Sequence, residues 1–310
     1  TINDADSTAL DATVLSAIGN KTTGTVTVTN AVAITGDHDQ LTAALVTAGT
    51  LVEVSDATVT VNDADATAIA ATELSAIGGA TTGTVTVTTA LAVTGDHDQV
   101  TAALVTSGTK VEVTDVTVTI NDADATAITA AELSAIGGAT AGTVTVTNAV
   151  AITGDHDQLT AALVTDDTKV EVEDAAVTIN DADTTAITAA ELSAIGGATT
   201  GTVTVTNAVA ITGTVDEVTA ALVTSSTKVA ITDASITISD TPTISELNDI
   251  ADLTTGVVTA TLAADSLANL GSLSTASTDV ITITVNDADE SAITASDLST
   301  CLLYTSDAAD

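Results

Sequence analysis

The feature that most constrains the fold of this 310-residue chain is a 59-residue internal repeat. The motif Asn-Asp-Ala-Asp occurs at residues 3–6, 62–65, 121–124 and 180–183, so successive copies are separated by one constant period. His38, His97 and His156 keep the same spacing. Near-identical repeats predict an array in which each unit buries its apolar surface against its neighbours.

The spacing of the motif divides the chain into three parts. Residues 1–239 hold four near-identical repeats, and residues 240–300 hold a degenerate, shortened repeat and the start of the next. Residues 301–310 match a translated sequencing adapter, so we expect read-through that is not native sequence. Because the chain opens inside a copy of the motif, we also expect it to be a metagenomic fragment of a longer protein.

Within one period the same order of segments is written twice. A short Leu-containing helix is followed by a Gly or Thr turn, a strand, an Asn or Asp corner and a second strand. In the copy beginning at Glu132, the strands are expected at 143–147 and 149–153, with Asn148 at the corner. The alternation of Val with Thr predicts that Val faces a core and Thr faces outward.

The spacing of the helices predicts the fold class. The intervals from Leu133 to Leu159 and from Leu159 to Leu192 each match the length of a solenoid turn. We therefore expect a mainly β fold, a repeat solenoid of parallel strands with short helical turns and two coils per 59-residue repeat. A core without aromatic residues suits a narrow coil filled by Val, Ile, Leu and Ala. The alternative is a string of small β-sandwich domains, for which a 59-residue unit is short.

The charge balance restricts the partners. The chain has 42 Asp and Glu against four Lys and Arg, a net charge of −38. Nucleic acid and anionic membranes both require a basic face, so neither is expected as a partner. No run of 18 apolar residues occurs, so we expect no membrane insertion.

Two segments carry a family resemblance. Residues 231–260 read ITDASITISDTPTISELNDIADLTTGVVTA, and residues 191–213 read ELSAIGGATTGTVTVTNAVAITG. These segments resemble the giant repetitive cell-surface proteins of marine cyanobacteria and similar secreted bacterial repeat proteins of the adhesin or surface-layer type. The resemblance implies export without disulfides, an extracellular or cell-surface location, and no catalytic residues. The partners expected are neighbouring repeats of the same giant chain, with cell-surface polysaccharide or other cells as further candidates.

An Asp-x-Asp pair follows the second strand of most coils and is the candidate metal site. If Asp37 and Asp39 align with Asp63 and Asp65 in a stack, the carboxylates form two ladders of like charge. Ca²⁺ takes six to eight oxygen ligands and would relieve that repulsion. The competing interpretation is that Asp39, Asp65 and their counterparts are helix N-caps and solvated surface charge, because a helical stretch follows each of them. The candidate ligands are Asp37, Asp39, Asp63, Asp65, Asp96, Asp98, Asp122, Asp124, Asp155, Asp157, Asp181 and Asp183.

The remaining patterns favour no further chemistry. His38, His97 and His156 lie two coils apart and cannot share one metal ion, so we expect surface histidines in an acidic patch. Thr rows such as 143–147 are also found in ice-binding solenoids, but Glu171 and its copies would interrupt that face. Every acidic pair is a copy of its neighbours, whereas an active site is singular, so we expect no enzyme.

The sequence thus predicts a non-catalytic structural segment, a stalk, surface-layer component or adhesin shaft, of a large secreted acidic repeat protein. The alternative is a calcium-binding repeat module whose stacked Asp-x-Asp turns become ordered on Ca²⁺. Ice binding through the Thr rows is a remote alternative.

Overall fold

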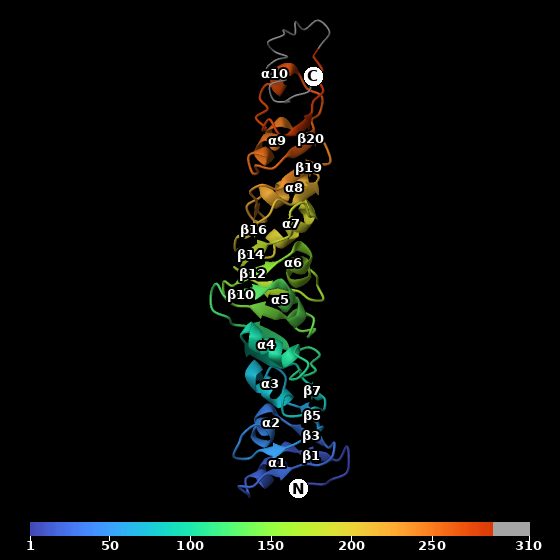
Figure 1. Ribbon diagram of the computed structural model, residues 1–310, viewed down its shortest axis with the longest axis vertical. Helices are drawn as coiled ribbons and strands as arrows, with labels where there is room; N and C mark the ends of the chain where they lie inside the picture. Colours follow the sequence, from blue (N-terminus) through green and yellow to red (C-terminus); the bar gives the residue numbers. More distant parts are fainter. Residues whose placement is uncertain (288–310) are drawn as a thin grey trace. The chain divides into compact units, whose positions relative to one another are not determined.

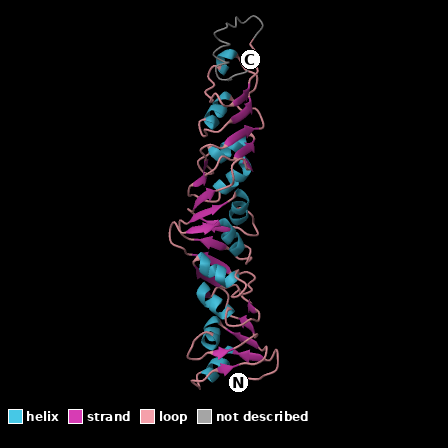
Figure 2. Ribbon diagram, viewed as in Figure 1, coloured by secondary structure: helices cyan, strands magenta, loops and turns pink. Residues whose placement is uncertain are grey.

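The computed structural model describes residues 1–287, which fold into short parallel strands and short helices (Figures 1 and 2). They divide into two compact units. Unit 1 comprises Thr1–Val150 and Ala161–Glu173, and unit 2 comprises Ala151–Thr160 and the chain from Asp174 onward. The expectations for residues 288–300 and 301–310 lie outside the described residues.

Unit 1 contains five helices and twelve strands among its described residues. The helices are α1 (Ala12–Gly19), α2 (His38–Leu45), α3 (Ala71–Gly78), α4 (His97–Leu104) and α5 (Ala130–Gly137). The strands are β1 (Ala9–Asp11), β2 (Val26–Thr27), β3 (Ala33–Gly36), β4 (Val52–Glu53), β5 (Thr58–Val61), β6 (Ala68–Ala70), β7 (Val85–Val87), β8 (Ala92–Gly95), β9 (Thr117–Ile120), β10 (Ala127–Thr129), β11 (Val144–Val146) and β13 (Val170–Val172). Their pairing orders are β1-β3-β5-β7, β2-β4 and β6-β8-β9-β11-β13.

Unit 2 repeats this organisation. Its helices are α7 (Ala189–Gly196), α8 (Val215–Leu222), α9 (Ile244–Ala251) and α10 (Leu267–Leu270), and the unit boundary falls inside α6 (His156–Leu163). Its strands are β12 (Ala151–Gly154), β14 (Ala176–Ile179), β15 (Ala186–Thr188), β16 (Val203–Val205), β17 (Ala210–Gly213), β18 (Val229–Ala230), β19 (Ser235–Ile238), β20 (Val258–Thr261) and β21 (Val280–Thr282). They pair in the orders β12-β14-β16-β18 and β15-β17-β19-β20-β21.

The strands stack like residue on like residue. In β11, Val144 and Val146 are buried and Thr145 is partly exposed, as the alternation predicts. Val144 lies beside Val118 of β9 on one side and Val170 of β13 on the other. Among the described residues, every strand pair within each of the two units is parallel. This contradicts the β-sandwich alternative, whose sheets are antiparallel.

The structure is a solenoid-like arrangement of repeated parallel strands and short helices, but it is not mainly β. Strands account for only about 26% of the chain, and nine of the helices in residues 1–287 have eight residues each. The prediction of a mainly β fold therefore understated the helices. The segments expected to be short helical turns are complete two-turn helices, most of which have a side-chain N-cap. No helix in this part of the chain has the length and apolarity needed to cross a membrane.

The number of coils per repeat also differs from the prediction. In unit 2, Ala186 of β15 pairs with Ala210, and Ala210 pairs with Ser235, so two turns lead from Ala186 to Ser235. These two turns end ten residues before the 59-residue repeat that starts at Ala186 is complete. A turn holds one helix and two strands, whereas the repeat from β15 to β19 holds two helices and five strands. Each repeat thus makes about two and a third turns, not two.

The additional third of a turn is the segment that follows the Asn-Asp-Ala-Asp motif. The sequence analysis placed a helix directly after this motif, but a three-residue strand intervenes: β6, β10 or β15. The chain enters each of these strands through a residue with positive φ: Ala66 (60°), Ala125 (60°) and Thr184 (64°). The left-handed conformation thus occurs here and not at the Asn and Asp corners between the strands.

Candidate functional site

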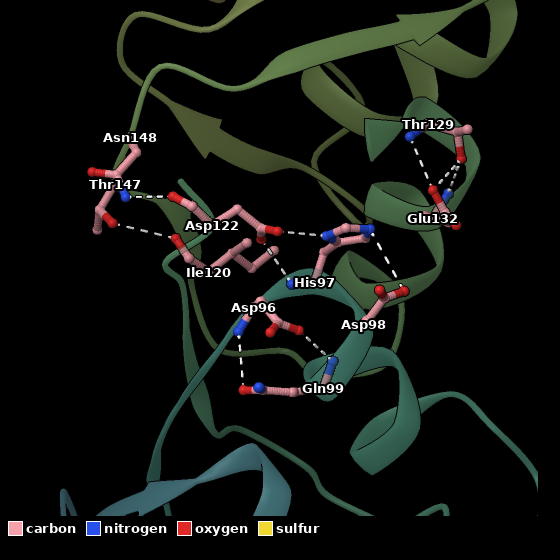
Figure 3. Close-up of polar contacts among 10 residues, drawn as sticks. All are labelled: Asp96, His97, Asp98, Gln99, Ile120, Asp122, Thr129, Glu132, Thr147 and Asn148. Atoms are coloured by element: carbon pink, nitrogen blue, oxygen red, sulfur yellow. Dashed lines mark hydrogen bonds and ion pairs between the residues drawn. The ribbon is translucent and has the colours of Figure 1, made fainter. Parts of the chain in front are cut away.

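The recurring polar feature of the fold is a contact between a helix and the Asn-Asp-Ala-Asp motif of the following coil. Gly95 at the end of β8 pairs with Ile120 at the end of β9, so His97 comes to lie opposite Asp122. The backbone N–H of His97 donates to Asp122 Oδ2 at 2.8 Å, and His97 Nδ1 lies 2.7 Å from Asp122 Oδ1 (Figure 3). His38 with Asp63, and His156 with Asp181, repeat both contacts.

This register replaces the expected ladders of like charge. The sequence analysis aligned Asp37 with Asp63, but Gly36 pairs with Val61, which sets His38 opposite Asp63. The shift is a single residue. It exchanges a stack of carboxylates for a histidine paired with a carboxylate, so this repulsion is not present.

The histidine and its partner are largely withdrawn from solvent. The side chain of His97 is 12% exposed and that of Asp122 is 5% exposed, so the expected surface histidine in an acidic patch is wrong. Because a carboxylate only accepts hydrogen bonds, Nδ1 carries the proton and Nε2 points away from Asp122. Burial, the largest single influence, lowers the pKa of His97. The hydrogen bond and charge of Asp122, with the charges of Asp98 and Glu132, outweigh burial and raise the pKa overall.

The aspartate also anchors helices that lack a histidine. At the start of α8 the N–H of Val215 donates to Asp240 at 2.7 Å, and at the start of α10 the N–H of Leu267 donates to Asp287 at 2.8 Å. In each case a carboxylate from the following coil satisfies a free N–H at the positive end of a helix. An aspartate therefore links successive coils at each of these helix starts. It is buried where it faces a histidine, at Asp63, Asp122 and Asp181, and is not buried at Asp240 and Asp287.

The twelve candidate aspartates have four different roles. The first of each Asp-x-Asp pair before α2, α4 and α6 accepts from the N–H three residues on, as an N-cap: Asp37, Asp96 and Asp155. The second is more than four-fifths exposed in the first turn of the helix: Asp39, Asp98 and Asp157. In the Asn-Asp-Ala-Asp motif the first is the buried anchor: Asp63, Asp122 and Asp181. The second accepts from an N–H 25 residues on: Asp65, Asp124 and Asp183.

The competing interpretation placed the N-caps at Asp39, Asp65 and their counterparts, but the N-caps before α2, α4 and α6 lie two residues before Asp39 and its copies. Asp39 and Asp65 are exposed, as the same interpretation expected of surface charge, and neither caps a helix. The helices that follow the Asn-Asp-Ala-Asp motif have another cap. Thr129 accepts from the N–H of Glu132, and Glu132 accepts in return from the N–H and hydroxyl of Thr129 (Figure 3). The hydroxyl of Thr129, followed by its N–H, holds the pKa of Glu132 below its usual value. Thr188 and Glu191 form the same capping box at α7.

The corresponding helix α3 lacks this capping box. Its N-cap is Ala70, which has no side-chain oxygen, and no side-chain cap is formed. Glu73, the counterpart of Glu132, instead brings a carboxylate oxygen close to His38 and Asp39. One ligand atom from each of the three residues lies within 4.8 Å of the other two. Among residues 1–287 this is the one group of three His, Asp or Glu side chains that meets so closely. The sequence analysis missed it, although Ala70 at the Thr position of the other copies was a readable signal.

The comparisons with known proteins assign no family. No protein-family model matches the chain, and a search of curated proteins returns no match.

Proposed function

We propose that this chain is a non-catalytic structural segment of a large, secreted, acidic repeat protein, serving as a stalk, a surface-layer component or an adhesin shaft. The observation that supports the proposal most is the helix anchor, which recurs at α2, α4, α6, α8 and α10. Each anchor joins one coil to the next. The recurring polar contacts of the fold therefore hold neighbouring coils together along the chain.

The side chains that reach the surface fit the same role. The clusters of His and Asp side chains recur at 59-residue spacing, whereas catalysis depends on a singular arrangement of groups. We propose an extracellular or cell-surface location, with further repeats of the same protein as the first partners. Cell-surface polysaccharide or other cells are the proposed targets of the complete protein.

Chains of two, four and six repeats test the structural role. We expect the maximum dimension from small-angle X-ray scattering to increase linearly with the number of repeats, because each repeat contacts only its sequence neighbours. Binding of the same chains to immobilised bacterial polysaccharides separates a passive shaft from an adhesive surface. A maximum dimension that stays constant as repeats are added would contradict the structural role.

The calcium module is the alternative function, and the aspartate contacts give it less support. Nine of the twelve candidate ligands already accept a protein N–H, which leaves Asp39, Asp98 and Asp157. Replacing these three with Asn should abolish calcium binding in a calorimetric titration if the alternative is correct. For ice binding, Thr145 pairs directly with Glu171 in the neighbouring strand, which interrupts the Thr row.

A further inference from the structure

We propose that His38, Asp39 and Glu73 form a binding site for one divalent transition-metal ion of the Zn²⁺ class, and that the other repeats lack it. The site lies within unit 1, where the starts of α2 and α3 meet. It is independent of the structural role proposed above, because a shaft without a metal ion and a metal-binding chain without a shaft are both possible outcomes.

The distances place the three groups close to a coordination sphere. His38 Nε2 lies 3.7 Å from Asp39 Oδ1, and Glu73 completes a set within 4.8 Å. Ligand atoms that lie about 2.0–2.1 Å from a tetrahedral Zn²⁺ are roughly 3.3 Å apart. The distances between the three ligand atoms must therefore shorten by about 1 Å or less on average when the ion binds. The side chain of Asp39 is 85% exposed, so no packed neighbour opposes that movement.

The histidine is already held in the orientation that a metal ion requires. Asp63, whose side chain is 5% exposed, lies 2.6 Å from His38 Nδ1 and fixes the proton there. In the neutral imidazole Nε2 is then unprotonated, and it lies 3.7 Å from Asp39 Oδ1. A carboxylate behind the ligating histidine is the usual second partner in zinc sites, where it sets the tautomer and increases the basicity of the imidazole.

The charges and the donor atoms select the class of ion. Asp39, Glu73 and Asp63 carry three negative charges, which outweigh the partial positive charges of the two helix N-termini. One imidazole nitrogen with two carboxylates suits Zn²⁺, Co²⁺ or Mn²⁺, whereas Ca²⁺ takes six to eight oxygens. Three protein ligands leave a fourth position for water.

The capping residue explains why the copies differ. At α5 and α7 the carboxylates of Glu132 and Glu191 are engaged by Thr129 and Thr188, with Oγ1 to Oε2 distances of 2.7 Å. At α3 the N-cap is Ala70, so Glu73 has no such competitor. His97 and Asp98 lie 3.6 Å apart, nearly as in the first site. Only the third ligand, Glu132, is missing there, because Thr129 engages its carboxylate.

Titration of the full chain with Co²⁺ tests the proposal, because tetrahedral Co²⁺ absorbs strongly in the visible range. With excess Mg²⁺ present to occupy nonspecific carboxylates, we expect one tight Co²⁺ site per chain, from which Zn²⁺ displaces Co²⁺. His38→Gln and Glu73→Gln should each weaken binding roughly tenfold or more, in line with the loss of one ligating group. His97→Gln and His156→Gln are the matched controls and should leave the site unchanged. Equal effects of the three histidine substitutions, or no visible spectrum, would overturn the proposal.

A pair of capping substitutions tests the role of Glu73 more sharply. Ala70→Thr should draw Glu73 into a capping box and weaken Co²⁺ binding. Thr129→Ala should release Glu132 and create a second Co²⁺ site with His97 and Asp98. Circular dichroism should show both variants folded, since each substitution changes only an exposed N-cap residue. A stoichiometry that stays at one ion in Thr129→Ala, with unchanged affinity in Ala70→Thr, would show that Glu73 is not a ligand.

Discussion

At the scale of single residues, aspartates in similar sequence contexts have unlike environments. Asp122 is buried and accepts two hydrogen bonds from His97, whereas Asp98, one residue after that histidine, is 87% exposed. Both belong to Asp-x-Asp pairs. The difference arises from the pairing of β8 with β9, which sets one carboxylate against a helix start and leaves the other in water.

Asp122→Ala is expected to lower the free energy of unfolding by about 3 kcal/mol, because it leaves two buried donors of His97 without an acceptor. Urea denaturation followed by circular dichroism measures the change. Asp98→Ala is the matched control and should shift the free energy of unfolding by no more than about 0.5 kcal/mol. Similar effects of the two substitutions would contradict the assignment of Asp122 as the anchor.

The histidine pairs predict a pH dependence of stability above neutral pH. The pKa values of His38, His97 and His156 are raised above 6.5, against the effect of burial, by the buried aspartates and the nearby Asp and Glu charges. A raised folded-state pKa means that protonation contributes stability that is complete below pH 6.5 and is lost as the pH rises through the folded-state pKa. Urea midpoints measured in chelator should therefore fall as the pH rises above about 6.5 and through the raised folded-state pKa.

The chain with all three histidines replaced by Gln is the control for this prediction. Its urea midpoint should be nearly flat over the same pH range, because the carboxylates and lysines do not titrate there. An equal fall in this variant and in the natural chain would exclude the histidines as its cause.

The sequence alone could predict only part of this chemistry. It identified the aspartates as the polar residues that recur, and it placed a helix start after Asp39 and its copies, one to two residues beyond the observed start. It could not identify which carboxylate is buried, because that depends on pairing between residues from different coils. An alignment by motif placed Asp63 beside Asp37, and the structure differs from that alignment by one residue.

At the scale of elements, glycines at the ends of helices set how closely neighbouring coils approach. A Cβ atom on Gly137, the last residue of α5, would overlap the backbone carbonyl oxygen of Thr168 in the next coil. That carbonyl belongs to a turn in which the hydroxyl of Thr168 donates to the carbonyl of Ala161. The neighbour is backbone on a constrained turn, so it cannot easily move aside.

Gly137→Ala is therefore expected to destabilise the fold by about 3 kcal/mol through forced separation of α5 from that turn. Gly108→Ala is the control, since no heavy atom lies within 4 Å of its would-be Cβ. It should be neutral, or stabilising by up to about 1 kcal/mol through a less flexible unfolded chain. Thermal unfolding of both variants decides the matter, and equal melting temperatures would contradict the close contact at Gly137.

The elements themselves were partly readable from the sequence. Alternating Val and Thr correctly located β11 and β12, and the Leu-containing segments correctly located the helices. The strands β6, β10 and β15 were missed because three residues such as Ala-Ile-Thr are too short to show alternation. Without these strands we predicted two coils per repeat. The additional strand in every repeat adds a further third of a turn.

At the scale of the whole molecule, the charge is strongly unbalanced and the apolar core must overcome it. Four Lys and Arg oppose 42 Asp and Glu, and many of these carboxylates recur at nearly every coil. His38, His97 and His156 each form ion pairs with aspartates, and these contacts are few against so large a negative charge. Cohesion therefore comes mainly from the stacked Val, Ile, Leu and Ala side chains that are almost fully buried in both units.

We accordingly expect folding to be assisted by salt. The Debye length is about 30 Å at 0.01 M salt and about 10 Å at 0.1 M, so in dilute buffer each carboxylate interacts with many others. The folded state holds those charges closer together than the unfolded chain does. Weak screening therefore destabilises the folded state more than the unfolded chain. Circular dichroism in chelator should show a lower melting temperature at 0.01 M than at 0.5 M NaCl.

Comparison of Ca²⁺ with NaCl at equal ionic strength separates screening from specific binding. If millimolar Ca²⁺ raises the melting temperature and matched NaCl does not, the exposed carboxylates bind Ca²⁺ directly, and replacing Asp39, Asp98 and Asp157 with Asn should remove the difference. If both salts act alike, the effect is screening, and the same substitutions should only reduce its size because they remove three negative charges. A melting temperature independent of salt in chelator would contradict both, and would mean that burial of the aliphatic core exceeds the repulsion at every ionic strength.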